Sequence, residues 1–430
     1  MEKTIDDGYI PECVTEALMT QQEILYSIDG VYDRFEHYQM QTGPTHEFEG
    51  LPEIPVTIRN IGWTLGNDCP YRCTHCYSMN ARVKGQNMTK AMIERVVHQL
   101  KVNGVETVNL GGNEPLFTNG PNPRDTLLPV IIESLVQSGI EVGLTTSGIT
   151  LLWLYHHYRE SFHLLNDIDI SFDSPFREEH NANRGAKVYD QAIESLQICQ
   201  RYQKPHTCIM AGMKWNFSLR HLERLVEIAK QYGANIRINP VKPVEPKHMD
   251  VALPPDMYYE GFSYLLKRCR PIDLGEPPLA AVTDFQQARR CPCGRTSFRI
   301  HSITPTGEIY VSPCVYLHDF KAPLNLLTHD LREIIQSPQF RVFRQRNANP
   351  DMIEGCQGCD LIAQCGGGCS ARSYLYALHR DGQKTMLARD PYCPKKVQPT
   401  QVFPQRPTIH AEQRLVHMDY LCTWIGTPYN

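Results

Sequence analysis

The chain has 430 residues, of which 41% are hydrophobic and 21% are charged, and its formal net charge is -4. This composition is typical of soluble globular proteins, and such a weak charge argues against a polyanionic partner, so we expect no nucleic-acid partner. No apolar run approaches the ~20 residues that span a bilayer, and the first residues lack the basic and apolar regions of a secretory signal. We therefore expect no membrane partner and a cytoplasmic location.

Strands and helices alternate between residues 51 and 250, after an N-terminal extension over residues 1–50 with mixed helical patterning. Amphipathic helices are predicted at 89–104, 124–139, 188–203 and 218–233, and Thr89 is the candidate N-cap of the first. Strands are predicted at 56–65, 106–110, 141–148, 167–173, 206–213 and 235–240. Alternation at this spacing predicts right-handed βαβ units, a parallel sheet and the α/β fold class.

Four distinctive loops follow the first four predicted strands. They are "NDCPYRCTHC" at 67–76, "GGNEP" at 111–115, "TSG" at 146–148 and "DSP" at 173–175. Parallel barrels and open parallel sheets place their active sites at the carboxyl ends of the strands. We therefore expect these loops to converge on one mouth.

The character of the chain changes beyond residue 250. Residues 251–290 are rich in proline and are predicted to be a linker around one helix at 258–269. Residues 291–395 are dense in cysteine and glycine with little helical periodicity, so we expect a second domain that folds around metal. Residues 396–430 are interpreted as a C-terminal tail, to which the sequence assigns no chemistry.

Sixteen cysteines are unevenly spread, and in a reducing cytosol such groups indicate metal rather than disulfides. Cys69, Cys73 and Cys76 have the spacing Cys-x3-Cys-x2-Cys. Three thiolates can hold three irons of a [4Fe–4S] cluster and leave the fourth iron open for a small molecule. The alternative is a zinc knuckle with His75 as the fourth ligand. Five further cysteines are isolated: Cys13, Cys199, Cys208, Cys269 and Cys422.

The Cys69–Cys76 motif after a first strand resembles the signature of the radical S-adenosylmethionine (SAM) enzymes, and the resemblance extends over about residues 55–395. In that family the amino and carboxylate groups of SAM chelate the open iron. Cleavage of SAM then yields a 5′-deoxyadenosyl radical that takes hydrogen from an unactivated carbon. The resemblance implies a partial (β/α)6 TIM-like barrel, in agreement with the six predicted strands.

The other loops resemble the SAM-binding loops of this family. "GGNEP" is similar to the family's "GGEP" loop with an inserted Asn113, which implies that Glu114 accepts from the SAM ammonium. "DSP", with His180 and Arg184 downstream, resembles the family's "DGP…H…RG" stretch, which implies ribose and carboxylate contacts. The implied SAM-binding residues are His75, Tyr77, Gly111, Gly112, Asn113, Glu114, Ser147, Asp173, Ser174 and Arg184. No catalytic acid or base follows from the sequence.

The second cysteine field is similar to the SPASM extension, which carries two auxiliary [4Fe–4S] clusters in radical SAM enzymes. If the ligands pair as in the family, the first cluster takes Cys291, Cys293, Cys314 and Cys369, and the second takes Cys356, Cys359, Cys365 and Cys393. The weak point is the Cys291-Pro292-Cys293 pair, because one of its thiolates can fail to reach an iron and leave it open. Zinc is the alternative here too. The implied cofactors are SAM and three [4Fe–4S] clusters.

Enzymes with this resemblance mostly modify peptides, so the sequence predicts a radical SAM enzyme that modifies a ribosomally made precursor peptide. Cross-linking, oxidation or backbone excision such as tyramine splicing are the candidate outcomes. The alternatives are oxidation of Ser or Cys to formylglycine, as in anaerobic sulfatase maturation, and a non-catalytic iron–sulfur electron-transfer protein. Expected partners are the precursor peptide, an electron donor such as flavodoxin or ferredoxin, and a separate leader-recognition protein, because residues 1–50 are too short for a full leader-binding winged helix.

Overall fold

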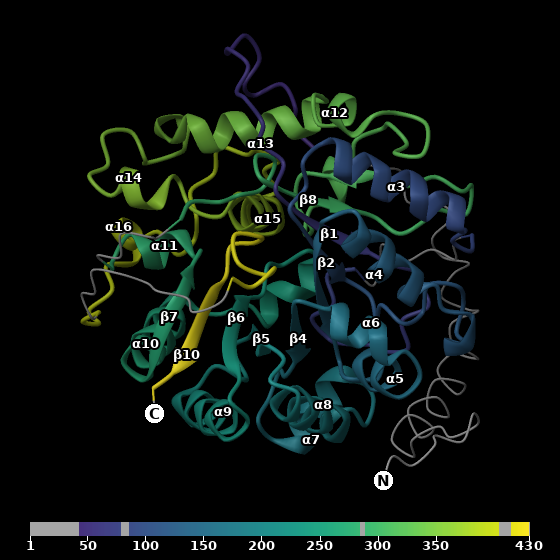
Figure 1. Cartoon of the computed structure of the whole chain (residues 1–430). Helices are drawn as coiled ribbons and strands as arrows, with labels where there is room; N and C mark the ends of the chain where they lie inside the picture. Colours follow the sequence, from purple (N-terminus) through teal and green to yellow (C-terminus); the bar gives the residue numbers. More distant parts are fainter. Residues whose placement is uncertain (1–42, 79–85, 284–288, 404–413, 430) are drawn as a thin grey trace.

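A single ten-stranded sheet organises the computed structural model, which describes residues 43–78, 86–283, 289–403 and 414–429 (Figure 1). Its central six strands are parallel and follow one another in chain order, as the sequence predicts. They are β1 (Asn60–Thr64), β2 (Thr107–Gly111), β3 (Glu141–Thr146), β4 (Asp167–Ser171), β5 (His206–Gly212) and β6 (Asn235–Pro240). The sheet is open, and this α/β architecture confirms the predicted partial barrel.

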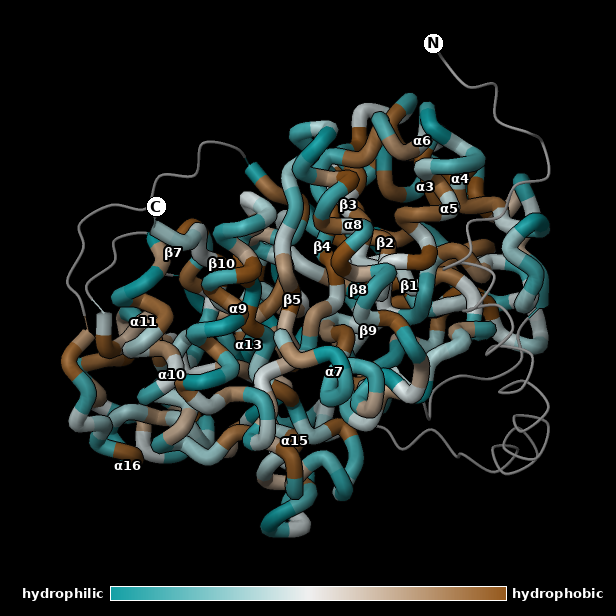
Figure 2. Tube along the Cα trace, turned by 90° about the horizontal axis from the view of Figure 1, so that it is seen from below, coloured by the Kyte–Doolittle hydropathy of each residue, from teal (hydrophilic) through white to brown (hydrophobic). Residues whose placement is uncertain are grey.

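Helices connect these strands and cover the outer side of the curved sheet (Figure 1). The Thr89 hydroxyl accepts from the Met92 amide and so caps the first, as predicted. The connecting helices are α3 (Lys90–Val102), α4 (Leu128–Gln137), α5 (Ile149–His157), α6 (Arg159–Leu164), α7 (Arg177–Arg184), α8 (Tyr189–Arg201) and α9 (Leu219–Tyr232). Figure 2 shows hydrophobic residues gathered along the strands, where they pack against the inner faces of the helices.

The sheet continues beyond both ends of the six-stranded core. Next to β1 lie β8 (Ser297–Ile300), which is parallel to it, and β9 (Val311–Ser312). Next to β6 lies β10 (Trp424–Pro428), antiparallel to β6 and to β7 (Cys269–Leu274). The chain's last described residues are therefore built into the sheet.

This arrangement gives structure to two segments that the sequence interpretation left open. The proposed linker at 251–290 contains α10 (Pro255–Arg268), β7 and α11 (Pro277–Ala280), so much of it packs against the core. The C-terminal tail contains α16 (Pro394–Val397) and β10. The N-terminal extension lies outside the described residues up to position 42. The domain boundaries themselves stay a prediction.

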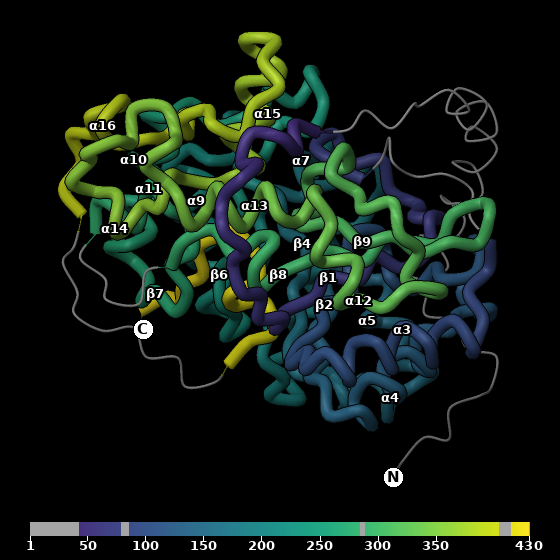
Figure 3. Tube along the Cα trace, turned by 90° about the horizontal axis from the view of Figure 1, so that it is seen from above, coloured from purple at the N-terminus to yellow at the C-terminus, as the bar shows by residue number. Residues whose placement is uncertain are grey.

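The cysteine-rich region lies above the carboxyl ends of the strands. It contains α12 (Leu331–Ile334), α13 (Pro338–Ala348), α14 (Ile362–Cys365) and α15 (Ser370–Asp381). Residues 43–58 run across α13 (Figure 3). Arg341 and Gln345 of that helix donate to the carbonyl oxygens of Leu51 and Pro52, each at 2.6 Å. Helices long and apolar enough to cross a bilayer are absent from the described parts of the chain.

Candidate functional site

A cavity opens at the carboxyl ends of the parallel strands. Its wall includes Thr146 of β3, Ser171 of β4, Ala211 of β5 and Pro240 of β6. The loop after β1 and the loops after β2, β3 and β4 all reach this cavity. The expected convergence of four loops on one mouth is therefore confirmed.

Cys69, Cys73 and Cys76 lie together on the cavity wall. Backbone hydrogen bonds hold their loop to α7, because the amides of Arg72 and Thr74 donate to the carbonyls of Arg184 and Asn183, at 3.2 and 3.0 Å. Cys69 and Cys73 are buried, and Cys76 is partly exposed. The three thiols therefore face one space, as a shared metal group requires.

The spacing of these thiols fits an iron–sulfur cluster better than a zinc ion. Four thiolates around zinc, each about 2.3 Å from the metal, hold their sulfurs roughly 3.8 Å apart. In the described residues, no three cysteine or histidine ligand atoms lie within 4.8 Å of one another. A [4Fe–4S] cluster separates its ligands more widely because each thiolate binds a different iron. The donor set and its spacing thus fit such a cluster.

Glu114 is a buried carboxylate in the cavity wall, and its partners are neutral groups. The side chain is 3% exposed. One carboxylate oxygen accepts from the hydroxyls of Thr146 and Thr150, and the other accepts from the Ser147 amide at 3.0 Å. Among the described residues, no Lys, Arg or His nitrogen lies within ion-pair distance of it. A buried carboxylate normally has a cationic partner, so this position fits a bound ammonium group.

Asp173 and Arg184 form a buried ion pair at the same mouth, with Arg184 Nε 2.7 Å from Asp173 Oδ2. Burial alone would raise the pKa of Asp173, but the charges of Arg184, His75 and His180 outweigh it and lower that pKa to about 2. The Nη1 atom of Arg184 donates to Ser147 Oγ at 3.3 Å and to the sulfur of Cys73 at 3.6 Å. Arg184 therefore places a fixed positive charge beside one of the three thiols.

Most of the predicted SAM-binding residues lie on this wall, where several also hold the loops together. Asn113 donates to the Gly66 carbonyl at 2.6 Å and accepts from Ser78 at 3.0 Å, which ties the glycine loop to the cysteine loop. Gly112 has a φ of +93°, and a Cβ there would lie 2.4 Å from Thr64 Oγ1, so the turn requires glycine. The predicted residues on the wall are His75, Tyr77, Gly112, Asn113, Glu114, Ser147, Asp173 and Arg184.

Gly111 and Ser174 are not among the residues that line the cavity. Gly111 ends β2, where a Cβ would lie 3.0 Å from the Cβ of Thr145. Ser174 is fully buried, donates to Glu179 at 2.6 Å and accepts from the Phe176 amide at 3.1 Å. Its hydroxyl therefore holds the turn before α7. Asp173 is the member of the Asp173–Ser174 pair that faces the cavity.

The auxiliary cysteines differ in burial, and their pairing into two clusters stays a prediction. Cys291, Cys293, Cys314 and Cys369 are each at most 3% exposed and belong to one buried cluster of side chains. The second group lies nearer the surface, with Cys359 and Cys365 partly exposed. Burial raises the pKa of Cys365 to about 12, and the neighbouring charges of Asp390, Cys393 and Cys356 add to the rise. Cys356 in turn interacts with Cys393 and Cys359.

Sequence comparisons agree with this geometry. The sequence model of the Radical SAM superfamily matches residues 63–235, and that of an iron–sulfur cluster-binding domain, SPASM, matches residues 291–360. The chain is a radical SAM/SPASM protein.

Several relatives of this radical SAM/SPASM protein cover most of its length. An uncharacterised protein of Archaeoglobus fulgidus is 27% identical over 79% of both chains. Mycofactocin maturase MftC of Mycobacterium tuberculosis is 23% identical over 81% of this chain and 85% of its own. At these coverages, each alignment includes parts of both the radical SAM and the SPASM regions of this chain.

Two solved structures share the fold of the radical SAM/SPASM protein. Native anSMEcpe with bound AdoMet aligns over 79% of this chain and 95% of its own, with a TM-score of 0.57 and 16% identity. Streptococcus suis SuiB bound to precursor peptide SuiA aligns over 78% and 76%, with a TM-score of 0.54 and 15% identity. At these identities the likeness supports the fold of both regions.

The structure adds three residues that the sequence interpretation of the radical SAM/SPASM protein did not include. Lys242, just after β6, and Tyr316 both line the cavity, and Lys242 Nζ lies 5.1 Å from the centre of the Tyr316 ring. Lys242 could have been found, because it follows a sixth strand end, as the loops chosen from sequence follow the first four. The third residue, Cys422, contacts the first auxiliary group, and no nearby motif indicated it.

Proposed function

We propose that this chain is an enzyme that uses SAM and a [4Fe–4S] cluster to modify a ribosomally made precursor peptide. The observation that carries the proposal is the cavity itself. Three clustered thiols and a buried glutamate without a described cationic partner share one wall. An iron–sulfur cluster with an open iron and a ligand that bears an ammonium group would complement both features.

Different residues would hold the cluster and SAM. Cys69, Cys73 and Cys76 would hold the cluster, and Glu114 would accept from the SAM ammonium. Arg184 would attract the SAM carboxylate while its donation to Cys73 offsets the negative charge of that thiolate. Bound together, cluster and SAM supply a radical that removes hydrogen from an unactivated carbon.

The SPASM cysteines would hold two further [4Fe–4S] clusters. The division into a buried and a more exposed group supports this number, because each group contains at least four thiols. The exposed group includes Cys359 and Cys365, which an external electron donor such as flavodoxin or ferredoxin could approach. The cluster in that group would then pass electrons inward.

A peptide substrate is supported by the relatives. MftC is a mycofactocin maturase by name, and SuiB was solved with its precursor peptide SuiA. The chain would act on its own precursor, presented by a separate leader-recognition protein. Lys242 and Tyr316 lie on the cavity wall and are candidates for contact with the reacting residue.

A peptide can pair with a free strand edge, and the sequence "GEIYV" at 307–311 is typical of such an edge. In the structure, however, the backbone groups of this segment already have partners. The carbonyl oxygens of Ile309 and Val311 accept from the amides of Leu326 and Ala322, at 2.8 and 2.9 Å. The Ile309 amide donates to Asn325 at 3.1 Å. Since the chain itself occupies these groups, the peptide must enter elsewhere.

Formylglycine formation is the weaker enzymatic alternative. It needs a base close to the substrate, and the cavity wall of the described chain has two carboxylates, Glu114 and Asp173. Glu114 is assigned to the SAM ammonium in this proposal, and Asp173 is paired with Arg184. No further carboxylate of the described wall is left to act as that base.

The test is to incubate anaerobically reconstituted protein with SAM, a reductant and each short peptide encoded beside its gene. We expect one peptide to change mass while 5′-deoxyadenosine accumulates. Reactions with a Cys69→Ala, Cys73→Ala, Cys76→Ala variant are the control. Turnover of a small metabolite, with every peptide left unchanged, would overturn the proposal.

A further inference from the structure

Cys422 lies within the first auxiliary cysteine group, although 28 residues separate it from Cys393, the nearest cysteine in the sequence. Its side chain belongs to the same buried cluster as those of Cys291, Cys293, Cys314 and Cys369, and the charges of Cys291 and Cys369 act on its thiol. Like the members of that group, it is almost completely buried, with 2% exposure. The group therefore contains five thiols, one more than the four irons of a [4Fe–4S] cluster require.

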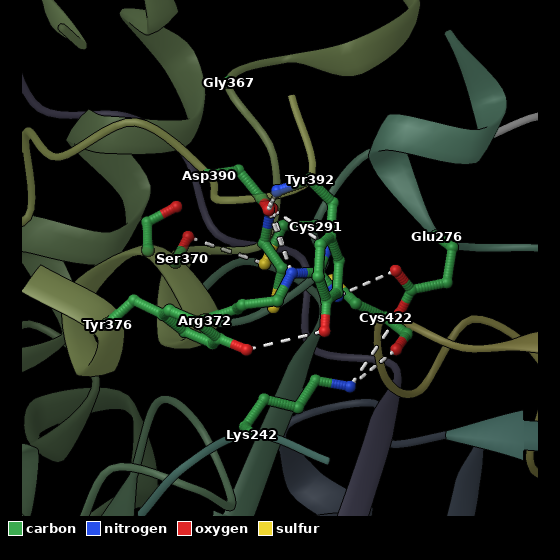
Figure 4. Close-up of polar contacts among 12 residues, drawn as sticks. Lys242, Glu276, Cys291, Gly367, Ser370, Arg372, Tyr376, Asp390, Tyr392 and Cys422 are labelled. Atoms are coloured by element: carbon green, nitrogen blue, oxygen red, sulfur yellow. Dashed lines mark hydrogen bonds and ion pairs between the residues drawn. The ribbon is translucent and has the colours of Figure 1, made fainter. Parts of the chain in front are cut away.

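Hydrogen bonds from five separate donors hold the backbone around Cys422. The five consecutive carbonyl oxygens of residues 419–423 each accept a hydrogen bond. The donors are Asn60, Ser297, Arg289, Lys242 and Gly275, in that order. Lys242 Nζ lies 3.1 Å from the Cys422 oxygen and 3.8 Å from Glu276 (Figure 4). Cys422 is thus held in one place relative to both regions of the protein.

A buried charge network joins this anchor to another member of the group. Glu276 accepts from Arg372 at 2.9 Å, and Arg372 also pairs with Asp390 at 2.9 Å (Figure 4). Asp390 in turn accepts from the Cys369 amide at 2.8 Å. Lys242, Glu276, Arg372 and Asp390 therefore connect the backbone of Cys422 to that of Cys369. The two thiols are positioned as a pair.

Two glycines of the barrel leave room for the segment that carries Cys422. A Cβ on Gly62 of β1 would lie 1.5 Å from the Tyr420 hydroxyl, and one on Gly143 of β3 would lie 2.9 Å from Val416 and His417. His417 is fully buried and is hydrogen-bonded to Asp167 of β4. The two glycines and this buried contact fix the C-terminal segment against the sheet.

The Cys291-Pro292-Cys293 pair explains why a fifth thiol is useful. Only one residue separates Cys291 from Cys293, whereas the irons of a cubane occupy separate corners and each takes its own thiolate. Two thiolates this close in sequence are poorly placed to bind two irons, which leaves one iron to be bound by another residue.

We propose that Cys422 is a ligand of the first auxiliary cluster, together with Cys314, Cys369 and one thiolate of the Cys291–Cys293 pair. The first auxiliary cluster would then have a full set of four protein ligands, with no iron left open for substrate. This assignment rests on the proposed auxiliary clusters. It also means that the C-terminal segment completes both the barrel interior and a metal site.

The test uses protein in which Cys69, Cys73 and Cys76 are already replaced by alanine, so that the SPASM clusters alone contribute. This background should hold about eight irons per chain, as two four-iron clusters require. Adding Cys422→Ala should take one thiolate from one cluster, which three thiolates can still hold, and so should shift one of two reduced-state EPR signals while the iron stays near eight. The matched control is Cys208→Ala, which removes a fully buried thiol from β5 and should leave both signals unchanged.

Two further variants make the result decisive. Cys422→Ser keeps the size of the side chain and offers an oxygen ligand, so it should shift the EPR g values of one cluster even if the alanine variant folds poorly. Of Cys291→Ala and Cys293→Ala, one should leave both signals unchanged. Eight irons and an unchanged spectrum in the Cys422→Ser protein would overturn the assignment. A background without iron would instead overturn the auxiliary clusters themselves.

Discussion

The replacement Glu114→Gln tests how the cavity would recognise SAM. It keeps the shape of the side chain and removes its negative charge. The Ser147 amide needs an acceptor, so the remaining carbonyl oxygen should turn toward it. The new amide nitrogen then faces the hydroxyls of Thr146 and Thr150, which can rotate to accept. We therefore expect the fold and the iron content to survive.

The expected loss of affinity follows from the burial of this carboxylate. A hydrogen bond to a charged group contributes about 1.5–3 kcal/mol, and at 3% exposure there is little water to replace it. That loss corresponds to a roughly tenfold to hundredfold rise in the Kd for SAM.

Anaerobic calorimetry on reconstituted protein can measure this change. The matched control is Glu133→Gln on α4, which makes the same chemical change away from the cavity and should leave the Kd unaltered. A Glu114→Gln protein that holds its full iron and binds SAM within twofold of the wild type would refute the reasoning. Glu114 would then be a residue that only braces the loop.

Two other predictions concern the metal content and the C-terminal segment. Replacing Cys69, Cys73 and Cys76 by alanine should lower the iron from about twelve to about eight per chain and abolish SAM cleavage, and continued 5′-deoxyadenosine formation would exclude these ligands. Replacing His417 by leucine should destabilise the fold by about 1.5–3 kcal/mol, because it removes a buried hydrogen bond to the Asp167 carboxylate. The midpoint of denaturant unfolding, measured on the metal-free protein, should fall, and an unchanged midpoint would show that this contact contributes nothing.

The barrel and the loops at its mouth could be predicted because their signals are local. The six strands are short and alternate with helices along the chain, and parallel pairing follows from that alternation. Thr89 could be identified as a cap because capping depends on the three residues that follow it. The clustered thiols are also a local signal, since Cys69, Cys73 and Cys76 fall within eight residues.

The contribution of the C-terminal segment could not be predicted, because its partners are distant in sequence. Strand β10 pairs with β6 and β7, which precede it by more than 150 residues. Cys422 shares no short spacing with another cysteine, and Gly62 and Gly143 resemble ordinary strand glycines until Tyr420 and His417 are placed against them. The sequence suggests a linker at 251–290 because this segment is rich in proline. Proline is also common in the first turn of a helix, and it occupies that position in α10 and α11.

The central claim is that a radical formed in this cavity takes hydrogen from a peptide. The most direct measurement uses precursor peptides from the gene neighbourhood, synthesised with deuterium at each residue type in turn and incubated with reconstituted protein, SAM and reductant. The account predicts that one labelled residue transfers deuterium to 5′-deoxyadenosine while that same peptide changes mass. A modified peptide with no label in 5′-deoxyadenosine from any position, or label taken up from a small metabolite instead, would contradict it.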